Sequence, residues 1–135
     1  MADWLLKTEP STYSFADLEK AKKAVWDGVA NPVALRNLRA LKVGDRVVVY
    51  HTGDEKAAVG LATVTREAYP DPKGKNPRLV VVDLQVGKRL PRPVTLAEIK
   101  AVASFAQSPL VKQGRLSVVP LEPAQWKALE ALSRA

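Results

Sequence analysis

Apolar residues in this chain recur with strand-like spacing in some segments and helix-like spacing in others, and turn residues separate them. Runs of β-branched and other apolar residues predict strands over residues 3–7, 46–50, 59–66, 78–86 and 116–121. Gly60 lies inside one run, which favours a bulge or the close approach of another segment to the backbone. Pro91 and Pro93 are expected to break the chain after the fourth strand.

Helix starts are marked by capping residues. Ser14 with Asp17, and Thr95 with Glu98, have the spacing of a capping box. Asn31 is a capping residue followed by Pro32 at the first helical position. They predict helices over residues 14–23, 95–102 and 31–41, and Pro123 begins a fourth over 123–133. Residues 26–29, which turn on Gly28, and residues 104–114 are expected to be irregular.

The predicted order of elements is strand, two helices, three strands, helix, strand and helix. Turns or loops join the three central strands, so these strands are expected to pair antiparallel. A doubly wound parallel sheet is therefore excluded. The sequence predicts an α+β fold, a mixed and mostly antiparallel β-barrel with flanking helices, formed by residues 1–135 as a single domain.

Composition narrows the functional classes. The 135 residues contain no cysteine and one histidine, His51, so disulfides, thiolate metal sites and histidine-rich metal clusters are excluded. No apolar stretch approaches the length of a membrane span, and the N-terminus does not resemble a signal peptide. We therefore expect a cytoplasmic protein that binds no membrane, no metal and no cofactor.

Positive charge is concentrated in one region. The formal net charge is +7, yet residues 1–72 carry ten basic and ten acidic side chains. Between residues 73 and 92, Asp83 is the single acid among six basic residues, which are Lys73, Lys75, Arg78, Lys88, Arg89 and Arg92. This excess indicates either a contact surface for a polyanion or a solvated flank that keeps the protein soluble.

Few residues stand out as candidates for chemistry. Nucleotide-binding glycine motifs and the serine-hydrolase elbow are absent. Glu9 and Asp27 are loop carboxylates that could face a cleft, a weak basis for a hydrolase. Trp26 lies off any periodic apolar face, which is compatible with a lid on the core or with a surface on which a base stacks. His51 ends a predicted strand, where a structural hydrogen-bonding role is the usual one.

Several ordered motifs together resemble the EVE domain family, which is part of the PUA-like superfamily. The resemblance covers essentially the whole chain. Its stretches are Trp4-Leu5-Leu6-Lys7-Thr8-Glu9-Pro10, Tyr13-Ser14, Trp26-Asp27-Gly28-Val29 with Asn31, Gly44-Asp45, Tyr50-His51-Thr52, Ser108-Pro109-Leu110-Val111 and Arg115-Leu116-Ser117-Val118.

The resemblance implies a PUA-like barrel and a nucleic-acid partner. Related PUA, ASCH, YTH and SRA domains hold RNA or DNA, and several accept one modified base in a pocket. The same is expected here for DNA or RNA with a modified cytosine or adenine. By analogy the base pocket would include Lys7, Thr8, Glu9, Trp26, Asn31, Tyr50, His51, Thr52, Ser108 and Ser117. The six basic residues of segment 73–92, together with Arg115, would contact phosphates.

Some positions depart from the family pattern. Ala30 stands where the family often has arginine, Gly114 where it often has serine, and Val33-Ala34-Leu35-Arg36 replaces a more polar run. The leading hypothesis is a non-enzymatic domain that binds a single base. Two alternatives stay open: an enzyme acting on a nucleoside with Glu9 and His51 as acid and base, and a module that binds another protein.

Overall fold

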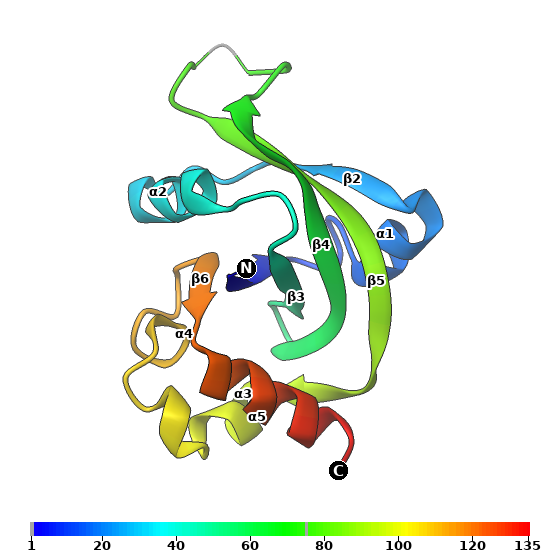
Figure 1. Ribbon diagram of the computed structural model, residues 1–135, viewed down its shortest axis with the longest axis vertical. Helices are drawn as coiled ribbons and strands as arrows, with labels where there is room; N and C mark the ends of the chain where they lie inside the picture. The colour runs from blue at the N-terminus through cyan, green and yellow to red at the C-terminus, as the bar shows by residue number, and fades with distance from the viewer. Residues whose placement is uncertain (1, 75) are drawn as a thin grey trace.

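A computed structural model describes residues 2–74 and 76–135 of the chain (Figure 1). The strands are β1 (Asp3–Thr8), β2 (Lys23–Trp26), β3 (Arg46–His51), β4 (Ala57–Pro70), β5 (Val80–Thr95) and β6 (Val118–Leu121). The helices are α1 (Phe15–Ala21), α2 (Pro32–Ala40), α3 (Leu96–Lys100), α4 (Pro109–Lys112) and α5 (Pro123–Ser133), with a 3₁₀ turn over Ala103–Phe105.

The strands form one mixed sheet in the order β2-β5-β4-β3-β1-β6. The prediction that the central strands are antiparallel is confirmed for β3, β4 and β5, whereas β1 and β3 pair in parallel. The sheet is not closed, so the predicted barrel is wrong in this respect. Strand β2 pairs with β5 alone, and α2 packs beside β6, where the Asn37 amide donates to the Val118 carbonyl at 2.8 Å.

The strands run further than the sequence predicted. Strand β4 extends to Pro70, and β5 continues through Pro91 and Pro93 to Thr95. Between the pairs Gly60–Arg89 and Ala58–Val94 the register shifts, so the prolines lie in extra residues of a bulge. Proline is compatible with extended backbone where no ladder hydrogen bond is required of its nitrogen, and the predicted break after residue 86 therefore does not occur.

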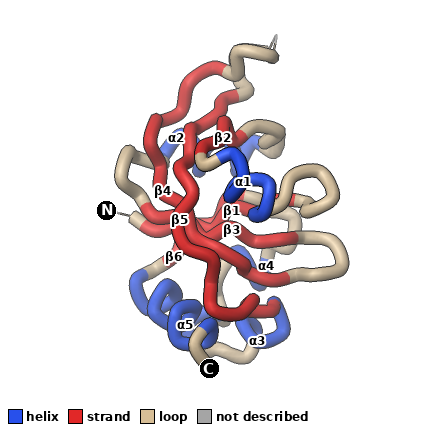
Figure 2. The backbone as a smooth tube through the Cα atoms, turned by 90° about the vertical axis from the view of Figure 1, so that its right-hand side faces the viewer, coloured by secondary structure: helices blue, strands red, loops and turns tan. Residues whose placement is uncertain are grey.

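The prediction that Trp26 lies in a loop is also wrong, because Trp26 ends strand β2. The long β4–β5 hairpin projects beyond the rest of the molecule, while α3 and α5 lie at the opposite end (Figures 1 and 2).

The predicted caps are confirmed: Ser14 and Thr95 form capping boxes, and Asn31 Oδ1 accepts from the N–H groups of Val33 and Ala34.

A buried carboxylate fixes the beginning of the parallel pair. Asp45 is 3% exposed and accepts from the Ala2 N–H at 3.0 Å, the Trp4 indole N–H at 3.0 Å and the Lys42 N–H at 2.9 Å. Burial by itself would raise the pKa of Asp45, but these hydrogen bonds lower it below the ordinary value. Asp45 therefore holds the N-terminal strand against the turn that precedes β3.

Arg46, the residue after Asp45, also stabilises the start of strands β1 and β3. The Arg46 guanidinium donates two hydrogen bonds to Asp3, at 2.8 and 3.0 Å, and lies 4.0 Å from the centre of the Trp126 ring. A bidentate pair fixes orientation better than a single contact, and the stacked indole belongs to α5. Strands β1 and β3 are thereby joined to the C-terminal helix.

We expect Asp45→Asn to lower the free energy of unfolding by about 1–3 kcal/mol at pH 7, because the amide cannot accept from all three donors. The stabilisation by a carboxylate whose folded pKa is depressed is fully present above its unfolded pKa, near 4, and is lost as the pH falls through the folded value. The difference in stability between parent and variant should therefore shrink below about pH 4.

Urea denaturation at pH 7 and at a series of acidic pH values would measure this difference. Asp54→Asn, in the exposed loop after β3, removes the same charge without these bonds and should resemble the parent. Equal stability of the Asp45→Asn and parent proteins at pH 7 would contradict the role assigned to Asp45.

The expected close approach at Gly60 is confirmed. The buried Phe15 ring of α1 lies directly over Gly60 in β4, and a Cβ atom at this position would come within 2.2 Å of the Phe15 ring. Glycine is therefore required for α1 to pack against the sheet.

Gly60→Ala should destabilise the fold by at least about 1–3 kcal/mol, since the ring cannot move within a packed core without displacing α1. Gly114→Ala is a suitable comparison, because a Cβ atom there meets nothing within 4 Å. Thermal unfolding of both variants would test this, and a Gly60→Ala protein as stable as Gly114→Ala would refute the packing argument.

Candidate functional site

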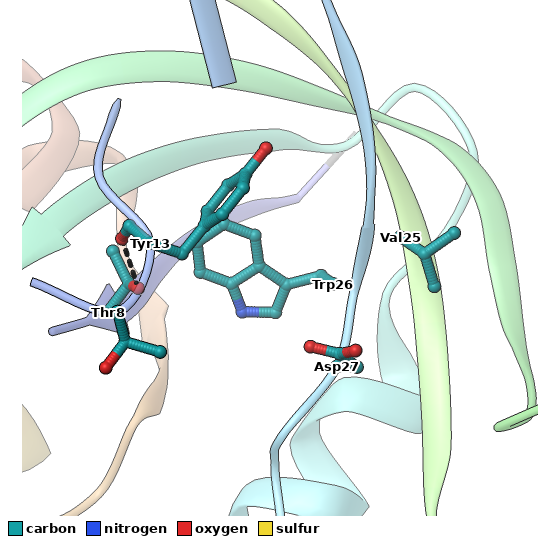
Figure 3. A pocket seen from close by; sticks show the side chains of 6 residues that line it. Thr8, Tyr13, Val25, Trp26 and Asp27 are labelled. Atoms are coloured by element: carbon teal, nitrogen blue, oxygen red, sulfur yellow. Dashed lines mark hydrogen bonds between the residues drawn. The ribbon is translucent and has the colours of Figure 1, made fainter. Parts of the chain in front are cut away.

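A cavity of about 260 Å³ opens between the end of β1 and the end of β2 (Figure 3). Its lining residues come from three segments and are Thr8, Thr12, Tyr13, Val25, Trp26 and Asp27. Drug-sized ligands occupy pockets of about 300–1,000 Å³, so this volume suits one ring system better than a dinucleotide.

Two aromatic side chains form a corner of this cavity. The Tyr13 and Trp26 rings meet edge to face, with centroids 6.3 Å apart and an interplanar angle of 87°. Trp26 is only 6% exposed, so it belongs to the core and offers the cavity a small part of its indole. The Thr8 hydroxyl donates to the Tyr13 carbonyl at 2.7 Å and fixes the loop that carries Tyr13 (Figure 3).

One side of the cavity carries a negative charge. Asp27 is the one charged side chain among the six lining residues, and it is exposed. Burial, and secondarily the charge of Asp17, raises the pKa of Tyr13, so its hydroxyl is protonated at neutral pH. The site therefore offers hydroxyl groups and one carboxylate to a ligand, and no cationic lining group.

The predicted base-pocket residues Thr8 and Trp26 line this cavity. Lys7 lies next to them, with its ammonium donating to the Gly114 carbonyl at 2.8 Å and its backbone N–H donating to the Ser117 carbonyl at 2.9 Å. The Lys7 Nζ is also 5.6 Å from the centre of the Tyr50 ring. The end of β1 thus brings Lys7, Thr8, Tyr50 and Ser117 into one neighbourhood.

Burial shifts the ionisation of two groups in this neighbourhood. It lowers the pKa of Lys7, which is half-buried, and raises the pKa of the buried Tyr50 hydroxyl. Thr52 joins the group through backbone, because its N–H donates to the Thr8 carbonyl at 2.9 Å.

His51 is occupied by internal hydrogen bonds. Its Nε2 accepts from the buried Phe15 N–H at 3.0 Å, which leaves the ring proton on Nδ1, 2.7 Å from Glu55 Oε1. Glu9 is exposed, accepts from the Ser11 N–H at 3.3 Å and lies against Gly53. Since both ring nitrogens of His51 have protein partners, neither is available to a substrate in this conformation.

Asn31 and Ser108 lie outside the Trp26 cavity. Asn31 caps α2 and lines a second cavity of about 280 Å³, which it shares with Gly114 and Arg115. Ser108 is buried, caps α4 by accepting from the Leu110 N–H at 3.1 Å, and borders a third cavity of about 470 Å³.

The basic residues predicted to contact phosphates divide into two groups. Arg89 pairs with Glu19 at 2.5 Å, and Arg92 pairs with Glu98 at 2.5 Å. The hydrogen bonds from Arg92, followed by those from Thr95, lower the pKa of Glu98 to about 2. The others form no ion pair with any described residue, and they are Lys73, Arg78, Lys88 and Arg115. Lys75 lies outside the described residues.

Two exposed arginines on α2 were not predicted from the sequence. Arg36 and Arg39 lie three positions apart on the helix, which contains no acidic residue. The Arg39 Nη2 donates to the Arg78 carbonyl at 2.5 Å, so the C-terminal half of α2 contacts the loop that joins β4 to β5. Their spacing on a helix without acids was the signal that could have revealed them.

Four lining residues of the cavity are absent from the predicted base pocket, and they are Thr12, Tyr13, Val25 and Asp27. Asp27 and Tyr13 both belong to stretches that resemble the EVE family, and Asp27 is also a carboxylate that could face a cleft, so the motifs were the signal that could have found them. Within residues 2–74 and 76–135, no helix has the length and apolarity to cross a membrane. The same residues contain no group of three or more His, Cys, Asp or Glu side chains that could hold a metal ion.

Comparison with known proteins identifies the family. The EVE domain model matches residues 2–132, and the chain belongs to the EVE domain family. Human thymocyte nuclear protein 1 is 31% identical, in an alignment that covers 97% of this chain and 68% of that protein.

Solved structures agree with the fold. A protein from Rhodopseudomonas palustris is 39% identical, with a TM-score of 0.90 over 99% of this chain and 94% of that chain. The human THYN1 protein in complex with 5-methylcytosine-containing DNA is 28% identical, with a TM-score of 0.92 over 100% of this chain and 99% of that chain.

Proposed function

We propose that this chain is a non-enzymatic nucleic-acid-binding domain that takes a single, modified base of DNA or RNA into the Trp26 cavity. The observation that carries the proposal is an aromatic corner of single-ring size, in a fold shared with a human protein that was crystallised with 5-methylcytosine-containing DNA. Aromatic walls favour flat ligands, because every base presents a π-face to them.

The residues around the cavity would contact different parts of the base. Tyr13 and the accessible part of Trp26 would contact its face, while the Thr8 and Thr12 hydroxyls would bond to its polar edge. The neighbouring residues would shape the mouth of the pocket, and these are Lys7, Glu9, Tyr50, Thr52 and Ser117. His51 would position the start of α1, because its Nε2 accepts a hydrogen bond from the Phe15 N–H.

Two predicted members contribute differently. Asn31 would contact the nucleic acid beside the pocket, at the second cavity, together with Arg115. Ser108 would support the fold of the loop before β6 as the cap of α4. The engaged nitrogens of His51 argue against the alternative in which His51 and Glu9 act as catalytic base and acid.

Phosphates would bind along basic residues that no carboxylate neutralises. Helix α2 begins at the Asn31 cavity and ends at the hairpin. A series of arginines therefore follows α2 from that cavity to the hairpin, in the order Arg115, Arg36, Arg39 and Arg78. Lys73 and Lys88 would add contacts further along the hairpin and β5. Arg89 and Arg92 would contribute less, since their charges are paired.

A base has to leave its stack before it can enter the cavity. Extrusion costs a few kcal/mol in a duplex and less at a mismatch or in a single strand. We therefore expect tighter binding to oligonucleotides in which the recognised base is unpaired or mismatched.

Titration with short oligonucleotides tests the proposal. Matched strands would contain cytosine, 5-methylcytosine, adenine, N6-methyladenine or an abasic position at one site, with binding followed by fluorescence anisotropy at fixed salt. We expect the base-containing strands to bind more tightly than the abasic strand, and one modified base to bind best. Tyr13→Ala should reduce the ratio of affinities for base-containing and abasic strands about tenfold, because stacking contributes ~1–3 kcal/mol per base. Equal binding to every strand would refute the base pocket.

Salt dependence tests the phosphate contacts. In the double variant Arg36→Gln/Arg39→Gln, we expect the slope of log affinity against log salt to become shallower by about 0.7–0.9 for each phosphate that is no longer neutralised. Arg89→Gln/Arg92→Gln removes the same net charge from paired arginines and should leave the slope almost unchanged. The proposed phosphate contacts along α2 are wrong if the two double variants give the same slope.

A further inference from the structure

Asp27 is the carboxylate that the Trp26 cavity places beside its ligand. We infer that Asp27 makes this cavity selective for a base with an exocyclic amino group on its pairing edge, such as cytosine or adenine, over thymine or uracil. The inference rests on the proposed function and adds the chemical property that decides which base is bound.

The position of Asp27 is fixed by its neighbours. Trp26 ends β2 and pairs with Val82 of β5, and Gly28, with a φ of 79°, turns the chain directly after Asp27. Figure 3 shows the Asp27 carboxylate and Thr8 on opposite sides of the Trp26 indole, with Tyr13 at the indole's edge. Paired backbone on one side and a defined turn on the other thus fix the backbone of Asp27, and with it the origin of its side chain, at the rim of the aromatic corner.

The carboxylate is also free to bind a ligand. Asp27 accepts no hydrogen bond from, and forms no ion pair with, any residue in the described part of the chain, and its side chain is exposed. By contrast, the Glu9 carboxylate accepts from Ser11 and lies against Gly53, and His51 has partners on both ring nitrogens. The acceptor assigned to the base edge is therefore Asp27 and not Glu9 or His51.

An ionised carboxylate can only accept hydrogen bonds. Cytosine and adenine present an amino donor at N4 and N6, so either can donate to Asp27. Thymine and uracil present the O4 carbonyl at the same place, and two acceptors facing one another repel. A phosphate group is disfavoured in the same way, because the cavity has no cationic lining residue to offset its charge.

The Asp27 carboxylate is exposed and hydrated in the free protein, so selectivity arises when a bound base displaces this water and faces the carboxylate with a donor or an acceptor. Discrimination by a well-placed polar contact to a base edge corresponds to roughly tenfold to hundredfold in affinity. The Thr12 hydroxyl can donate or accept, so it can adapt to either edge. The Thr8 hydroxyl donates its one proton to the Tyr13 carbonyl, so it can offer a ligand only an acceptor. Thr8 and Asp27 therefore both present acceptors to the base edge, and Asp27, the charged one, contributes most to the discrimination between the two classes of base.

The test uses a probe that differs from cytosine by the amino group alone. Single-stranded oligonucleotides would contain cytosine, 2-pyrimidinone (cytosine without its 4-amino group), thymine or an abasic site at one position, and affinity would be measured by anisotropy. We expect the parent protein to bind the cytosine strand roughly tenfold to hundredfold more tightly than the 2-pyrimidinone and thymine strands.

Variants then assign that preference to a residue. Asp27→Ala should bring the ratio of cytosine to 2-pyrimidinone affinity close to one, while the 2-pyrimidinone strand still binds better than the abasic strand. Asp27→Asn should narrow the gap between cytosine and thymine, because an amide can also donate to O4. Asp54→Ala removes the same charge from an exposed loop outside the cavity and should keep the parent ratios.

The outcomes separate this inference from the proposed function. If the parent binds cytosine and 2-pyrimidinone equally but both better than the abasic site, the base pocket stands and the role of Asp27 is refuted. If Asp27→Ala keeps the parent ratio, another group recognises the amino group and the inference is likewise overturned. If the parent binds the abasic strand as tightly as the cytosine strand, the proposed function fails, and the inference fails with it.

Discussion

The buried Asp45 carboxylate anchors the start of the parallel strand pair β1–β3. It gathers the Ala2 N–H, the Trp4 indole and the Lys42 N–H at one point, and so sets the start of β1 against the start of β3. The parallel register then follows residue by residue, from Asp3 beside Arg46 to Thr8 beside His51. A parallel pair has no hairpin turn to fix its register, so a side-chain anchor at one end has an unusually large effect.

The far end of the same pair controls the cavity. His51 closes β3 and receives the Phe15 N–H, and Phe15 in turn packs onto Gly60 of β4. This chain of contacts fixes the start of α1, and with it the loop that holds Tyr13 against Trp26. Because both of its ring nitrogens have partners within the protein, His51 links β3 to α1, and this positioning role agrees with the proposed binding function.

The folded arrangement also changes the meaning of the net charge. The sequence shows a basic segment over residues 73–92, but carboxylates from α1 and α3 pair with Arg89 and Arg92 within it. Meanwhile Arg36 and Arg39, from a part of the chain whose charges balance, lie on a helix with no acid, and Arg39 donates to the Arg78 carbonyl in the hairpin. Local positive potential is therefore decided by which charges meet across the fold, and a count along the chain misplaces it.

The family, the mixed α+β class and the capping residues Ser14, Asn31 and Thr95 could be predicted from the sequence. These features depend on neighbours within a few residues or on motifs that occur in order along the chain. Tertiary structure alone decided that the sheet stays open, that β5 continues past its prolines, and that Asp27 stands in the cavity while Ser108 does not. Each of these depends on contacts between segments far apart in the sequence, because strand pairing and burial, rather than local preference, fix where such side chains lie.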